Sequence, residues 1–160
     1  MAGSCVTVAL GLGTNQGDRI ENLQRAIGHL TAKIGKLTLS NLYESQALLC
    51  PGSPPEWNRP YLNMAACAQT SLRPEALLAE IKSIEKQMGR DLSAALWSPR
   101  IIDIDILLYG DLHTHSPTLT IPHPHLNVRP FAFLPLKEIS PDYTLPATLH
   151  EDTKIIGRFA

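Results

Sequence analysis

The sequence predicts an α+β fold in which helices pack on an antiparallel β-sheet. Segments rich in β-branched and aliphatic residues, which favour strands, are separated by two amphipathic segments with helical spacing. These segments follow one another in the order β, α, β, β, α, β. The chain has 160 residues, of which 44% are hydrophobic and 18% charged, so it is long enough for a buried core. We therefore expect residues 1–160 to form a single domain.

The first predicted strand and helix lie on either side of a polar turn. Residues 5–12 (CVTVALGL) are rich in strand-forming side chains. Residues 13–18 contain glycine, asparagine and aspartate, which are typical of turns. A helix is expected over residues 18–32, because its apolar side chains recur with helical period. They are Ile20, Leu23, Ile27 and Leu30.

The middle of the chain is expected to form two strands and a second helix. The strands are predicted over residues 36–45 and 61–70, with Leu62, Met64 and Ala66 sharing one face of the latter. The proline-rich residues 46–60 between them form a long loop, and such loops often bind ligands. The second helix starts at Pro74, which suits a first helical turn, and ends near Gly89.

The rest of the chain adds a loop, a fourth strand and C-terminal extras. Residues 90–99 form the loop, and the strand that follows carries two aspartates. A short strand is expected at residues 119–121 and a short helix over residues 129–138. This order of elements is that of the ferredoxin-like βαββαβ fold, which has an antiparallel sheet with helices packed on it. The fold alone does not decide the function.

The two aspartates are the most informative feature of the sequence. Asp103 and Asp105 are two positions apart in a strand, so their side chains share one face and their Cα atoms lie about 7 Å apart. Ile104, Ile106 and Leu108 are expected on the opposite face, in the core. Paired carboxylates repel each other, and Mg²⁺ is normally held by one or two carboxylates plus substrate phosphates. The pattern predicts a magnesium–nucleotide site; the alternative is a solvent-facing strand with two ordinary acids.

Arginines next to this strand suit the phosphates of a nucleotide. Arg90 and Arg100 lie at the two ends of a loop that contains Trp97, and a guanidinium binds phosphate oxygens in a bidentate manner. The loop is either a lid over a substrate or a surface segment anchored by the tryptophan. His123 is expected to contact phosphate. A structural zinc is disfavoured because no cysteine pair accompanies the histidines.

A second set of side chains suits a planar ring. Tyr61 and Asn63 share a strand face, and the Asn63 amide offers both a donor and an acceptor to an amide-like ring. Trp97 and Phe131 can stack on such a ring. The alternative for Tyr61 and Phe131 is ordinary core packing.

Composition argues against several partners. The net charge is -1, so we expect no general attraction to nucleic acid or to a membrane. No apolar run of about 18 residues is present. Three cysteines without metal-type spacing indicate free thiols in a reducing compartment. With no basic leader at the N-terminus, we expect residence in the cytoplasm.

Several separated motifs together resemble one enzyme family, 6-hydroxymethyl-7,8-dihydropterin pyrophosphokinase of folate biosynthesis. The resemblance extends from about Val8 to about Pro141. Its motifs are Leu12-Gly13-Thr14-Asn15-x-Gly17-Asp18, Tyr61-Leu62-Asn63, Glu85-x4-Arg90, Trp97-Ser98-Pro99-Arg100-x2-Asp103-x-Asp105-Ile106, Ile121-Pro122-His123, Arg129-x-Phe131 and Pro135-Leu136-x-Glu138-Ile139.

The resemblance implies a reaction and a set of site residues. Pyrophosphate would pass from ATP to the hydroxymethyl group of the pterin, releasing AMP, with Arg90, Arg100, Asp103 and Asp105 as catalytic residues and two Mg²⁺ ions at the aspartates. The nucleotide would be held by Glu85, Arg90, Trp97, Arg100, Ile106, Thr120, His123 and Arg129. The pterin would lie near Ser45, Leu48, Tyr61, Asn63, Trp97 and Phe131. Mobile loops and association with other folate-pathway enzymes are also implied.

The sequence departs from the family pattern at a few positions. Lys82 replaces a frequent glutamine, Leu92 and Thr118 stand where basic residues occur, and Pro124 replaces a frequent aromatic residue. Two other functions remain open on the residues alone. One is a metal-dependent nucleotide-sugar transferase, which also uses an Asp-x-Asp pair, and the other is a non-catalytic ferredoxin-like ligand-binding module. The aromatic and asparagine set beside the phosphate set disfavours both.

Overall fold

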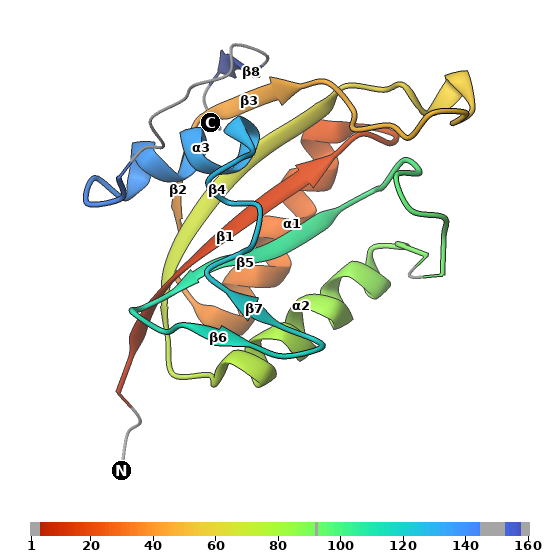
Figure 1. Ribbon diagram of the computed structural model, residues 1–160. Helices are drawn as coiled ribbons and strands as arrows, with labels where there is room; N and C mark the ends of the chain where they lie inside the picture. The colour runs from red at the N-terminus through yellow and green to blue at the C-terminus, as the bar shows by residue number, and fades with distance from the viewer. Residues whose placement is uncertain (1–3, 92, 145–152, 158–160) are drawn as a thin grey trace.

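The sheet of this protein is antiparallel, and two long central strands carry most of its pairing (Figure 1). The computed structural model describes residues 4–91 and 93–144, and the backbone of 153–157. The strand order is β5-β1-β4-β3-β8, with β2 also paired to β4. The bounds are β1 Val6–Thr14, β2 Thr38–Leu39, β3 Leu42–Ser45, β4 Tyr61–Thr70, β5 Asp103–Tyr109 and β8 Thr153–Gly157.

Helices cover both faces of the sheet (Figure 1). Helices α1 (Arg19–Ile34) and α2 (Pro74–Gln87) pack on one face, and α3 (Pro130–Ile139) packs on the other. A 3₁₀ turn, η1 (Pro55–Trp57), interrupts the long loop after β3, and β6 (Thr114–His115) pairs with β7 (Thr120–Ile121) beside β5. The order β5-β1-β4-β3 is that of a ferredoxin-like sheet, and the predicted fold class is confirmed.

Each face of the sheet buries its own core. The larger core joins the inward sides of α1 and α2 to alternate residues of the strands, including Leu62, Met64 and Ala66 as predicted. The smaller core lies beneath α3 and is built around Phe133 and Leu136. Burial on both faces explains why the central strands are mostly apolar. In the described part of the chain, no helix is long and apolar enough to cross a membrane.

Two of the predicted strands differ from the structure. The single strand expected over residues 36–45 is divided into β2 and β3 at Ser40, whose hydroxyl group accepts a hydrogen bond from the Ala65 N–H at 2.9 Å. At this point the Ser40 hydroxyl group, and not a backbone carbonyl, accepts the hydrogen bond between the strands. The C-terminal residues, for which no element was expected, supply β8 along the edge of β3.

The prediction for Leu108 was wrong. The pairing of β1 with β5 shifts between Ala9 and Leu10, so that Leu107 is an extra residue in β5. Such a β-bulge turns the following side chains to the other face. Leu108 therefore packs in the core under α3, whereas Ile104 and Ile106 lie in the larger core as predicted.

Candidate active site

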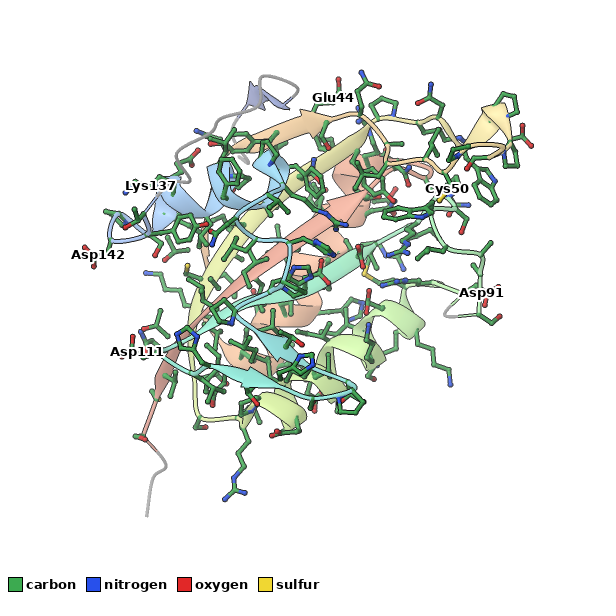
Figure 2. The ribbon with its side chains drawn as sticks, in the orientation of Figure 1. Glu44, Cys50, Asp91, Asp111, Lys137 and Asp142 are labelled. Carbon is green, nitrogen blue, oxygen red and sulfur yellow. The ribbon has the colours of Figure 1, made fainter. Side chains whose placement is uncertain are left out.

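A cleft of about 450 Å³ opens on the α3 face of the sheet. Its floor is formed by β1, β4 and β5, and its walls by α3 and the loops that precede β4 and β5. In Figure 2, Cys50 and Asp91 mark the two loops, which lie on the opposite side of the view from Asp111 and Asp142. Most of the residues predicted to bind substrates line this cleft: Leu48, Tyr61, Asn63, Arg90, Trp97, Arg100, Asp103, Asp105, His123, Arg129 and Phe131.

Four predicted site residues do not line the cleft. Ser45 and Glu85 are buried just beneath it and contact residues that do line it. The Ile106 side chain lies in the larger core, on the face of β5 away from Asp105, so only its backbone can face a ligand. Thr120 is half-buried on β7, where its hydroxyl group lies 2.9 Å from His115 Nδ1.

Glycines are the cross-strand partners of both aspartates. In the register of β1 with β5, Gly13 is the partner of Asp103 and Gly11 is the partner of Asp105. Cross-strand partners on one face normally pack side chain against side chain. Here the partner has no side chain, so each carboxylate faces the cleft. A Cβ atom on Gly13 would lie 3.2 Å from Asn63 Oδ1, within the same space.

Asp103 is neutralised by arginines from both ends of the preceding loop. Arg90 Nη1 lies 2.9 Å from Asp103 Oδ1, and Arg100 Nη1 lies 3.2 Å from Oδ2. Arg100 is also fixed through its backbone: its N–H donates to Asn15 Oδ1 at 2.8 Å, and its carbonyl accepts from the Asn15 N–H at 3.1 Å. The two arginines are thus positioned over one carboxylate by the fold itself.

The end of α2 determines where Arg90 lies. Gly89 has a φ of 93°, and the N–H groups of Gly89 and Arg90 donate to the carbonyls of Lys86 and Glu85. This is the Schellman pattern of helix termination, which requires a left-handed residue. It turns the chain back so that the Arg90 guanidinium donates a hydrogen bond to the Glu85 side chain.

Glu85 is a fully buried carboxylate surrounded by donors. Besides Arg90, the Ile104 N–H donates to Glu85 Oε2 at 3.3 Å. Lys82 Nζ forms an ion pair with Oε1 at 3.2 Å, and Oε1 accepts no hydrogen bond from the described residues. A buried carboxylate needs such partners to remain charged. Glu85 is therefore placed to fix the position of the Arg90 guanidinium, and its own carboxylate does not face the cleft.

Asp105 has no comparable partner among the described residues. Burial in the floor of the cleft, and next the charge of Asp103, raise the pKa of Asp105 from 3.8 to about 7. The side chain remains 44% exposed, because it faces the open cleft. A carboxylate that is crowded by another and left without a donor favours a cation. With Asp103 and the phosphates of a substrate it provides the donor set that suits Mg²⁺.

His123 is held next to Asp105 by backbone contacts. Its N–H donates to the carbonyl of Leu107, at the bulge of β5, and its Nδ1 accepts from the His125 N–H at 3.1 Å. The neutral ring therefore carries its proton on Nε2, which lies 3.9 Å from Asp105 Oδ2. Burial, followed by the positive charge of Arg129, lowers the pKa of His123. The ring presents a hydrogen-bond donor to the cleft.

Tyr61 and Asn63 form the opposite wall, as their shared strand face predicts. The Asn63 amide nitrogen donates to Ser45 Oγ at 2.9 Å and to the Tyr43 carbonyl at 3.3 Å, which fixes its orientation. Trp97 reaches the cleft from a left-handed backbone conformation, with a φ of 69°. Such a conformation is uncommon for a large side chain and is concentrated at functional sites.

Some cleft residues were not expected from the sequence. They include Gln46, Lys82, Leu96, Pro124, His125 and Ala132. The i, i+2 spacing of Gly11 and Gly13 in a strand was the signal that could have located the cleft floor beside the aspartates. Of the departures from the family pattern, Lys82 and Pro124 line the cleft. Thr118 lies exposed between β6 and β7, and Leu92 lies outside the described residues.

Comparison with known proteins identifies the family. The family model described as 7,8-dihydro-6-hydroxymethylpterin-pyrophosphokinase (HPPK) matches residues 9–141. The chain belongs to this family. The match includes every residue of the cleft.

Relatives of two lengths resemble the chain. A 2-amino-4-hydroxy-6-hydroxymethyldihydropteridine pyrophosphokinase of Aquifex aeolicus is 44% identical over 140 residues, covering 88% of this chain and 84% of that protein. A folate synthesis bifunctional protein of Chlamydia caviae is 42% identical over 135 residues, covering 84% of this chain. The chain spans only 30% of the length of that bifunctional protein.

Solved HPPK structures share the fold. The wild-type HPPK-DHPS of Plasmodium falciparum, crystallised with SDX-DHP, superposes with a TM-score of 0.65 over 90% of this chain and 42% of that chain. The sequence identity is 19%, so this likeness concerns the fold alone.

Proposed function

We propose that this HPPK-family protein transfers pyrophosphate from ATP to the hydroxymethyl group of 6-hydroxymethyl-7,8-dihydropterin. The products are the pterin diphosphate and AMP, and the reaction is a step of tetrahydrofolate biosynthesis. The observation that carries the proposal is that one cleft combines paired carboxylates, arginines and a wall for a planar ring. The family match over residues 9–141 supports the same reaction.

Two Mg²⁺ ions are proposed to bind at Asp103 and Asp105. Both carboxylates line the cleft and have glycines as their partners on β1, so the residues present fit a divalent cation shared with phosphate oxygens. When bound at these carboxylates, such ions would neutralise the charge of the triphosphate.

The cationic side chains are proposed to act on the phosphates. Arg90 and Arg100 enter the cleft from both ends of one loop and would stabilise the charge of the transferred group. His123 would donate from Nε2, and Arg129 would bind the triphosphate from its position just before α3. Glu85 would hold Arg90 in place, while Ile106 would contribute through its backbone and Thr120 from β7.

The pterin is proposed to bind on the opposite wall. Asn63, oriented by Ser45, would pair with the amide-like edge of the ring. Tyr61, Trp97 and Phe131 would pack on its faces, and Leu48 would cover it from the long loop. Holding both substrates in one cleft aligns the hydroxyl group with the triphosphate and excludes competing water.

The two alternatives lack support of this kind. Neither a nucleotide-sugar transferase nor a non-catalytic module accounts for the family match together with the asparagine and aromatic wall. We further propose that residues 1–160 form a single pyrophosphokinase domain in the cytoplasm. Because relatives include folate synthesis bifunctional proteins, other enzymes of that pathway are its proposed partners.

³¹P NMR of the protein with ATP, Mg²⁺ and 6-hydroxymethyl-7,8-dihydropterin tests the reaction. The appearance of AMP together with a pterin diphosphate would support the proposal. Formation of ADP would indicate transfer of a single phosphoryl group and would refute it. Unchanged ATP with a folded protein would also refute it, and Asp105→Ala supplies the matched blank for any slow hydrolysis.

A further inference from the structure

Arg129 contacts the rings that a pterin would need. Its guanidinium carbon lies 6.0 Å from the centroid of the Trp97 ring and 5.8 Å from that of Phe131, over both rings. Phe131 lies in the first turn of α3, two residues after Arg129 in the sequence. Trp97 lies in the loop before β5. A guanidinium is planar and stacks on aromatic faces, as a heteroaromatic ring does. The cation therefore occupies a surface suited to a flat substrate.

The other arginines of the cleft already have carboxylate partners. Arg90 and Arg100 contact Asp103. Among the described residues, the Arg129 guanidinium has no ion pair and makes no hydrogen bond. Its charge is nevertheless close enough to His123 to lower the pKa of that ring. Arg129 is thus an uncommitted cation at the boundary between the aromatic wall and the proposed phosphate site.

We propose that Arg129 is a positioning residue that couples the two substrate subsites. Without nucleotide, its guanidinium covers the Trp97 and Phe131 rings and competes with the pterin for them. The phosphates of a nucleotide attract the guanidinium away, because a charge-assisted hydrogen bond is stronger than contact with a ring. The rings are then free to receive the pterin. This inference rests on the proposed function, since it takes a pterin as the second ligand.

The size of the effect follows from the strength of the contact. A cation–π contact corresponds to about a two- to thirty-fold change in a binding constant. Because coupling between two binding sites is reciprocal, the pterin should strengthen nucleotide binding by the same factor as nucleotide strengthens pterin binding. Removal of the Arg129 side chain should abolish both effects.

Pterin affinity with and without a non-hydrolysable ATP analogue provides the test. Arg129→Ala should bind pterin about two- to thirty-fold more tightly than the unaltered protein when nucleotide is absent. The analogue should strengthen pterin binding in the unaltered protein and leave that of Arg129→Ala unchanged. Arg129→Lys keeps the charge but stacks less well, so it should bind pterin more tightly without nucleotide and retain part of the coupling. Equal or weaker pterin binding by Arg129→Ala, with coupling intact, would overturn the proposal.

Tryptophan fluorescence separates this proposal from the proposed function. In a Trp57→Phe background, emission reports on Trp97 alone, because the chain contains two tryptophans. The ATP analogue should change this emission without any pterin present, and Arg129→Ala should remove the change. If pterin binds to none of these proteins with or without the analogue, the proposed function fails. If pterin binds but Arg129→Ala leaves coupling and emission unaltered, only the role of Arg129 fails.

Discussion

Asp103 and Asp105 lie on the same face of β5, but only Asp103 is ion-paired with arginine. Its two oxygens contact Arg90 at 2.9 Å and Arg100 at 3.2 Å. The described residues offer Asp105 only His123 Nε2, at 3.9 Å. Two chemically identical groups about 7 Å apart therefore differ in the ligand-free protein: Asp103 is paired with arginines, and Asp105 has no arginine partner.

Asp105→Asn should stabilise the ligand-free protein at neutral pH. The pKa of Asp105 is raised from 3.8 to about 7, so the folded state holds this proton more tightly than the unfolded state. Stability is then lost as pH rises from about 4 to about 7, because the folded protein must accept a crowded negative charge. The neutral amide avoids this loss. Exposure to the cleft moderates the effect, and we expect Tm to rise by a few degrees at pH 8.

Thermal melts in EDTA at pH 5 and pH 8 measure this difference. The gain in Tm over the unaltered protein should be larger at pH 8 than at pH 5. Asp111→Asn removes an exposed carboxylate in the turn after β5 and serves as the control. Turnover by Asp105→Asn should be almost absent. A gain independent of pH would contradict the electrostatic cause.

Glu85→Ala should strongly destabilise the fold. The carboxylate is fully buried and accepts hydrogen bonds from Arg90 and from the Ile104 N–H. Removing it leaves buried donors unpaired, which costs about 3–5 kcal/mol. Glu80→Ala is the matched control, since Glu80 lies on the same helix in an exposed pair with Lys33 at 3.4 Å, worth about 1 kcal/mol or less. Urea denaturation compares the two, and equal losses would argue against the supporting role of Glu85.

Much of the fold was predictable because local signals agreed with it. β4 has the bounds expected for residues 61–70, and α2 begins at Pro74 as expected. Turn-forming residues and apolar periodicity mark these elements clearly. The division at Ser40, the bulge at Leu107 and the pairing of β8 with β3 were missed. Each depends on contacts between distant residues, which periodicity cannot reveal.

The site was predictable in its residue types and less so in its arrangement. The residues predicted to bind phosphate and metal and those predicted to bind a planar ring do line one cleft. The sequence pattern did not indicate that Glu85 is buried under Arg90, because that relation depends on how Gly89 ends α2. Nor did it indicate that the glycines of β1 face the aspartates, because strand register is a property of the assembled sheet.

Gly13→Ala should weaken pterin binding while leaving the fold intact. The new Cβ atom would lie 3.2 Å from Asn63 Oδ1 and 3.5 Å from Tyr61 Cδ1. Asn63 cannot move away freely, because Ser45 and Tyr43 hold its amide. We expect the pterin KM to rise about tenfold, equivalent to about 1.4 kcal/mol.

Gly28→Ala provides the contrast for that substitution. Gly28 lies within α1, and a Cβ atom there would meet nothing within 4 Å. Alanine at this position should stabilise the helix by about 0.4–1 kcal/mol and leave the pterin KM unchanged. Steady-state kinetics with a Tm for each protein measure both effects. An unaltered KM for Gly13→Ala would place the pterin elsewhere in the cleft.

Arg100→Ala should slow the chemical step more than it weakens substrate binding. The backbone of Arg100 remains fixed by its two hydrogen bonds with Asn15, so the truncation should not displace the loop. What is lost is a cation aimed at the transferred group, and removal of such a group reduces kcat by about 10²–10³-fold. Arg25→Ala, on the exposed face of α1, is the control for general charge effects. Single-turnover rates and pterin affinity, measured on the same proteins, separate chemistry from binding. A loss confined to pterin affinity would assign Arg100 to the ring rather than to the phosphates.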